Sequence, residues 1–144
     1  SSAASDVYKR QYEHSPEREI GVFPVTLTEA GLADEHIKGF GKTLNTGHWH
    51  GDMPGLTDNA VVLATSQGCP RQIVRFSPKH YAFQAHLEFD PEAIDLLIAA
   101  DGEEYLRKQN KELPFVQTPE QLRANDYSEM NKKLYDFLDS LTQA

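Results

Sequence analysis

Apolar side chains follow a strand-like pattern in the first half of the chain. Aliphatic, aromatic and threonine side chains gather in four short runs, namely Ile20–Leu27, Ala60–Thr65, Gln72–Phe76 and Tyr81–Ala85. Runs of this length and composition are typical of β-strands. The last three are joined by the short connectors QGCP and SPKH, which leave no room for a crossover. The pattern therefore predicts a three-stranded antiparallel meander.

The second half changes to a helical period. Asp90 is a good N-cap followed by proline, and Ala93, Ile94, Leu97 and Ile98 form an apolar stripe that ends near Gly102. Three further helical segments are expected. They are Thr28–Gly39, in one or two short turns, Glu103–Gln109, and Ser128–Leu141, which is expected to form an amphipathic closing helix.

The closing helix should pack one face against the body of the domain. Met130, Leu134 and Leu138 recur at helical spacing with Phe137 beside them, while Asn131 and other polar residues lie between them. We expect the first three side chains to be docked.

Composition narrows the function classes. The 144 residues suit one domain, and a formal charge of −8 argues against binding to nucleic acid or anionic membranes. A single cysteine, Cys69, excludes an internal disulfide, and no apolar run is long enough to cross a membrane. These features predict a cytoplasmic protein. The small, polar start, Ser1–Gln11, is interpreted as a leader outside the fold, which leaves 12–144 as the domain portion.

Candidate chemistry begins with His86 and Glu88, at the end of the run YAFQAHLE. On an extended chain residues two apart lie on the same side, so the carboxylate can orient the ring and leave its other nitrogen as a base. The same string is also compatible with a strand-end histidine and a solvated glutamate.

A second candidate is the segment HWHGD, which shows little hydrophobic periodicity. His48, His50 and Asp52 would share one face of an extended chain and could form a metal-ligand set. The following glycine and turn argue against that geometry, so we expect no metal here.

Together these segments resemble the C-terminal part of the class I glutamine amidotransferases, and most closely the free-standing subgroup called GMP-synthase-like. The resemblance rests on EIGVFPVTL, HWHGDMPGLTDNAVVLATSQGCPRQIV, YAFQAHLEFDPEAIDLLI and NDYSEMNKKLYDFLDSL. It implies a flavodoxin-like, three-layer α/β domain with a mixed central sheet, a β-meander and C-terminal helices. It also implies glutamine as substrate, no cofactor, and an ammonia acceptor or a synthase as partner.

The resemblance assigns roles to particular residues. His86 and Glu88 match the histidine and glutamate of the family's Cys-His-Glu triad, although Leu87 replaces the usual proline between them. His48, Trp49, His50 and Asp52 match a block near the glutamine pocket and are expected to bind substrate.

The family's nucleophilic cysteine has no counterpart in this chain. Cys69 matches a cysteine-proline position in a turn, and no glycine-flanked cysteine elbow is present. We therefore expect the C-terminal part of a longer domain, inactive alone. The alternatives are a γ-glutamyl peptidase or hydrolase of the same fold, a metal-binding module based on the histidines and Asp52, and a non-catalytic interaction module.

Overall fold

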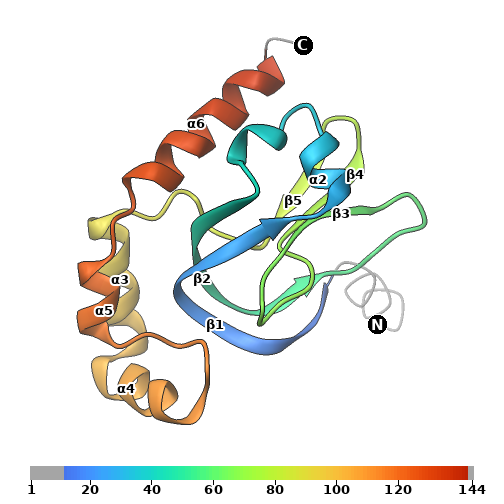
Figure 1. Ribbon diagram of the computed structural model, residues 1–144. Coiled ribbons are helices and arrows are strands. Elements are labelled where there is room, and N and C mark those ends of the chain that lie inside the picture. The colour runs from blue at the N-terminus through green and yellow to red at the C-terminus, as the bar shows by residue number, and fades with distance from the viewer. Residues whose placement is uncertain (1–11, 143–144) are drawn as a thin grey trace, which may run out of the picture.

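The computed structural model describes residues 12–142 and contains a five-stranded sheet with helices packed around it (Figure 1). Along the sheet the strand order is β2-β1-β3-β4-β5, and each neighbouring pair is antiparallel. The strands are β1 (Tyr12–Leu27), β2 (Thr43–Pro54), β3 (Val61–Thr65), β4 (Ile73–Ser77) and β5 (His80–Phe83). The predicted meander is confirmed as β3, β4 and β5. The predicted leader lies outside the described residues.

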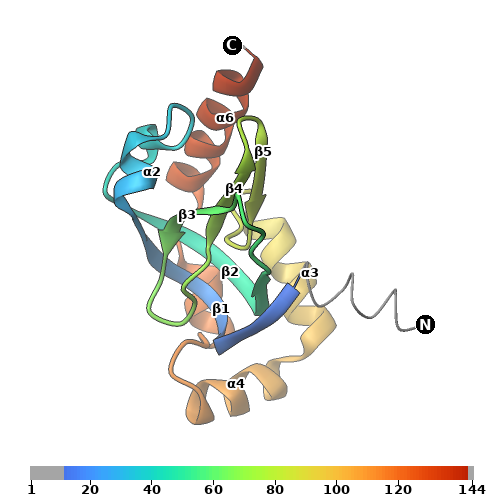
Figure 2. The same cartoon turned by 90° about the vertical axis from the view of Figure 1, so that its right-hand side faces the viewer.

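The helices gather mainly along one side of the sheet. They are α2 (Glu29–Ala33), the 3-10 turn η1 (Lys38–Phe40), α3 (Pro91–Asp101), α4 (Glu103–Glu112), α5 (Pro119–Ala124) and α6 (Ser128–Thr142). In Figure 2 the strands lie in front of α3 and α6, whereas α2 covers the end of the sheet near β3. The predicted α/β class is confirmed. Among the described residues, parallel pairing is confined to the single bridge between Ile20 and Val116.

The long strand β2 carries little sequence signal for a strand. It pairs with β1 from Tyr12 opposite Pro54 to Thr26 opposite Thr43, with an irregularity between His14 and Glu19. Its buried positions include threonine, glycine and histidine in place of the aliphatic side chains that usually mark a strand. This is why the HWHGD segment has a regular backbone despite its irregular pattern.

The helix boundaries follow the capping residues in the sequence. Asp90 accepts a hydrogen bond at 2.8 Å from the backbone N–H of Ala93, and α3 ends at Gly102, whose φ is +95°. Thr118 and Gln121 form a reciprocal capping box at the start of α5. Local hydrogen bonding therefore fixes both helix starts, and the start at Asp90 is the one that the sequence analysis predicts.

The closing helix corrects one detail of the expected packing. Met130 and Phe137 are buried and Leu134 packs against the core, but Leu138 is 46% exposed. At about 100° per residue, position 137 returns to within roughly 20° of position 130, whereas position 138 lies about 80° away. Phe137 therefore takes the place that Leu138 was expected to fill.

The core is one cluster shared by the sheet and the helices. Its most deeply buried members include Leu63 and Ile73 from strands and Ile98 and Leu106 from helices. Burial of apolar surface at this interface fixes the loop after β5, which carries His86 and Glu88, against both layers. In the described part of the chain, no helix is long and apolar enough to span a membrane.

Candidate active site

His86 and Glu88 form a short side-chain contact after β5. The Nδ1 atom of His86 lies 2.6 Å from Oε1 of Glu88, and the two side chains are 34% and 58% exposed. Partial burial raises the pKa of the Glu88 carboxyl, but the hydrogen bond from His86, a backbone hydrogen bond and the charge of His86 together outweigh burial, so the net pKa is lowered. A carboxylate in this position fixes the ring tautomer with the proton on Nδ1 and leaves Nε2 as a base.

The backbone of His86 is held by strand β2. Its N–H donates to the carbonyl of Gly47 at 2.7 Å, and its own carbonyl accepts from the Gly47 N–H at 2.9 Å. A Cβ at position 47 would lie 2.4 Å from the ring of Phe89 and 2.8 Å from the His86 carbonyl oxygen. Only glycine allows this close approach of β2 to the loop.

The four residues of the HWHGD segment with predicted site roles lie in different environments. His48 and His50 point to the side of β2 that carries Glu19 of β1, and both side chains are buried. Trp49 points the other way and donates from Nε1 to Asp101 of α3 at 2.9 Å. Asp52 lies 3.2 Å from His14. Neither histidine is open to a substrate in this arrangement, and the predicted substrate contacts of the segment stay predictions.

Glu19 is the residue that sequence reasoning missed. It lies opposite His50 in the β1–β2 register and is 1% exposed. Its carboxylate accepts from Gln72 Nε2 at 2.6 Å and from the Ser66 hydroxyl at 2.8 Å, and its Oε1 lies 3.0 Å from His50 Nε2. The available signal was an acidic residue directly before an apolar strand, inside the segment EIGVFPVTL.

Proton positions in this cluster follow from its backbone acceptors. A carbonyl oxygen only accepts, so His50 Nδ1 donates to Asp52 and His48 Nε2 donates to Phe23. Burial raises the pKa of the Glu19 carboxyl, but its contacts with His50, His48 and Ser66 together lower it below the ordinary value. Burial lowers the pKa of His48 to about 4, so this ring is neutral near pH 7.

The same cluster is the one place among residues 12–142 where the structure offers a metal-ligand set. One atom each from Glu19, His48 and His50 can be chosen so that all lie within 4.8 Å of one another. His48 Nδ1 and His50 Nε2 have no hydrogen-bond partner among the described residues, and a metal ion could supply one. However, the Glu19 carboxylate already accepts hydrogen bonds from Gln72 and Ser66, so the expectation of no metal is retained. Asp52 is not part of this set.

Comparison with known proteins shows which proteins this chain is similar to. No protein-family model matches the chain. It is 52% identical over 130 residues to the glutamine amidotransferase-like protein YfeJ of Salmonella typhimurium, covering 90% of this chain and 54% of that protein. The resemblance to the class I glutamine amidotransferases is confirmed.

Solved structures agree with this relationship. SMU.1228c superimposes with a TM-score of 0.89 at 52% identity, over 96% of this chain and 58% of that one. A glutamine amidotransferase from Methylobacillus flagellatus shares the fold with a TM-score of 0.81 at 20% identity, over 92% and 55%. The chain thus spans little more than half the length of these three proteins that it matches.

The single cysteine of the chain lies in the turn between β3 and β4. Cys69 is completely buried, and its Sγ contacts the carbonyl oxygen of Arg71 at 3.7 Å. Burial raises the pKa of the thiol, which disfavours the nucleophilic thiolate. This environment supports the prediction that Cys69 is a structural residue of the turn.

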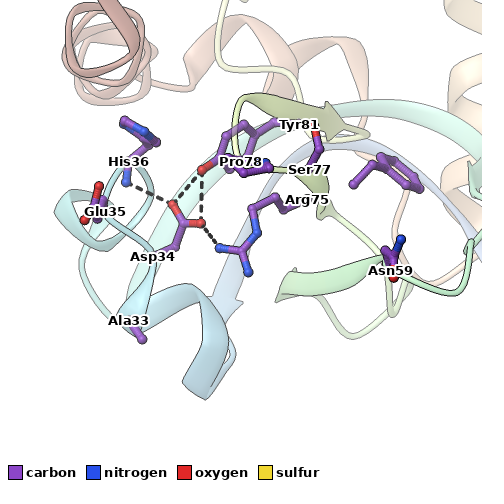
Figure 3. Close-up of a pocket in the computed structure, with 10 residues that line it drawn as sticks. Ala33, Asp34, Glu35, His36, Asn59, Arg75, Ser77, Pro78 and Tyr81 are labelled. Carbon is purple, nitrogen blue, oxygen red and sulfur yellow. Dashed lines mark hydrogen bonds and ion pairs between the residues drawn. The ribbon is translucent and has the colours of Figure 1, made fainter. Parts of the chain in front are cut away.

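A separate cavity of about 600 Å³ lies beside Asp34, between the segment after α2 and the β4–β5 hairpin (Figure 3). The Asp34 carboxylate accepts from Arg75 at 2.5 Å and from Tyr81 at 3.0 Å, and from the backbone N–H of His36. Burial and this carboxylate raise the pKa of Tyr81 to about 12. Both carboxylate oxygens of Asp34 are bound within the protein, so the network joins the segment after α2 to the β4–β5 hairpin.

Proposed function

We propose that this chain is the C-terminal part of one glutamine amidotransferase domain and supplies two members of a Cys-His-Glu triad. The observation that carries the proposal is the 2.6 Å contact between His86 Nδ1 and Glu88. It orients the ring as a general base requires, and Nε2 has no hydrogen-bond partner among residues 12–142. The 52% identity to an amidotransferase-like protein supports the same assignment.

In the proposed reaction a cysteine from outside this chain attacks the side-chain carbonyl of glutamine. His86 accepts the thiol proton at Nε2 and then gives it to the leaving nitrogen, so ammonia departs and a thioester remains. Water hydrolyses the thioester to glutamate and regenerates the thiol. Glu88 keeps the ring in the correct tautomer and stabilises its charged form.

The HWHGD segment has a supporting place in this proposal. Gly47 fixes the backbone of His86, and the buried 3.0 Å contact between His50 Nε2 and Glu19 lies where the adjoining part of β2 pairs with β1. We assign contact with glutamine to the part-exposed Trp49 and Asp52. His48 and His50 would influence substrate binding only through the strand that they support.

The chain alone is expected to release no ammonia from glutamine, because its single cysteine is buried in a turn. The natural protein that contains these residues together with a nucleophilic cysteine should hydrolyse glutamine. A γ-glutamyl peptide assayed beside glutamine separates the amidotransferase from a hydrolase of the same fold. Cleavage of the peptide without turnover of glutamine would contradict the amidotransferase assignment.

A further inference from the structure

The loop that carries His86 and Glu88 is held from the closing helix by one side chain. The amide Nδ2 of Asn131 in α6 lies 2.6 Å from the carbonyl oxygen of Leu87 and 2.9 Å from that of Phe89. Both partners are carbonyl oxygens, so they fix the orientation of the amide, whose NH₂ group has one hydrogen for each. Asn131 therefore holds the backbone on both sides of Glu88 through two hydrogen bonds.

The side chains on either side of Glu88 also restrain this backbone. Leu87 and Phe89 are only 2% and 5% exposed, so both are anchored in the core. The ring of Phe89 also stacks on the imidazole of His86, with centroids 4.6 Å apart and planes inclined by 7°. Any movement of the backbone at Phe89 is thus transmitted to the His86 ring.

The remaining support comes from the other side of the loop. Gly47 bonds the N–H and carbonyl of His86, while Asn131 bonds the carbonyls of residues 87 and 89. The segment between β5 and α3 is consequently fixed by a strand at one end and a helix at the other. Catalytic groups need this kind of support because a displacement of about 1 Å can cost about 100-fold in rate.

We infer that Asn131 is a positioning residue for the His86–Glu88 pair, acting through the backbone of residues 87 and 89. This inference rests on the proposed function for its effect on catalysis, but its effect on geometry can be measured without any turnover. It also gives α6, which carries no group of the proposed triad, a part in the reaction.

The test uses Asn131→Ala in the natural protein that contains these residues. The N–H proton on Nδ1 of His86, observed by NMR, reports the bond to Glu88, and Glu88→Ala, which removes the acceptor, provides the reference for its loss. We expect Asn131→Ala to abolish or strongly shift this signal. The kcat for glutamine should fall about 10- to 100-fold with KM unchanged, because the substrate pocket is untouched.

Two further variants separate positioning from simple loss of stability. Asn131→Asp keeps the shape of the side chain but removes both donors, and it should reproduce the effect if the alanine variant does not fold. Ser140→Ala removes a different side-chain contact of α6, the one at 2.9 Å between the Ser140 hydroxyl and His36 Nδ1. This variant should leave the His86 NMR signal and kcat unchanged.

Wild-type signal and kcat in a folded Asn131→Ala or Asn131→Asp protein would overturn the inference. Equal losses in Ser140→Ala would also overturn it, since they would show a general effect of helix docking. The proposed function fails separately, through full activity in His86→Ala. If the proposed function failed in this way, the NMR signal of His86 in the Asn131 variants would still show whether Asn131 positions the His86–Glu88 pair.

Discussion

Oε1 of Glu88 lies 2.6 Å from Nδ1 of His86, and although burial raises the pKa of the carboxyl, this bond is the largest of the contributions that together lower it. A carboxyl with a lowered pKa in the folded state stabilises the protein above its unfolded pKa, and loses that contribution as the pH falls through the folded value. In His86→Ala the bond is gone while the partial burial remains. We expect the pKa of Glu88 to rise in that variant, measured by NMR titration of the side-chain carboxyl. An unchanged pKa would show that the two groups are not bonded in solution.

The buried His48 should make stability depend on pH. Its folded pKa of about 4 lies below the ordinary value of 6.5, so the unfolded chain binds its proton first as the pH falls. Stability from this residue is therefore complete above pH 6.5 and lost between 6.5 and about 4, by about 3 kcal/mol. His48→Gln keeps a donor for the Phe23 carbonyl but does not titrate. Urea unfolding at both ends of this range should show a smaller decrease for the variant, whereas equal decreases would contradict the prediction.

The packing of α6 predicts different costs for two leucines in the same helix. Leu134 packs against the core, so Leu134→Asp should lower the free energy of unfolding by about 2–5 kcal/mol. Leu138 is 46% exposed, and Leu138→Asp should change it by no more than about 0.5 kcal/mol. Denaturant unfolding of the two variants measures the difference. Similar values for both would mean that the helix is not docked as described.

The cluster of Glu19, His48 and His50 should contain protons and no metal ion. Elemental analysis of protein purified without added metal is expected to find zinc well below one per chain, because the Glu19 carboxylate is already bound by Gln72 and Ser66. His48→Gln serves as the matched control, since it removes one ligand of the set. One zinc per chain that is lost in this variant would establish a metal site instead.

The sequence predicts those parts of the fold that depend on local patterns. Asp90 marks a helix start because its side chain accepts a hydrogen bond from the backbone N–H three residues ahead, and the short connectors determine the meander. The sequence pattern predicts burial of Leu138 in place of Phe137, because repeated spacings of four residues move away from the helical period of about 3.6 residues.

The site was predictable only in part, for a physical reason. His86 and Glu88 are two residues apart, so an extended chain brings them together without tertiary structure. Glu19 meets His50 only through the β1–β2 register, and Asn131 reaches the loop that carries His86 and Glu88 only when α6 is docked. Such contacts join residues distant in sequence, and no periodicity in either segment indicates its partner.

The central claim is that His86 serves as the base for an attacking cysteine outside this chain. The most direct measurement is ammonia release from glutamine by the natural protein with its nucleophile, compared with its His86→Ala, Glu88→Gln and Cys69→Ser variants. We expect a loss of at least about 1000-fold for His86→Ala, a smaller loss for Glu88→Gln, and nearly full activity for Cys69→Ser. Full activity in His86→Ala, or its abolition in a folded Cys69→Ser protein, would contradict the account.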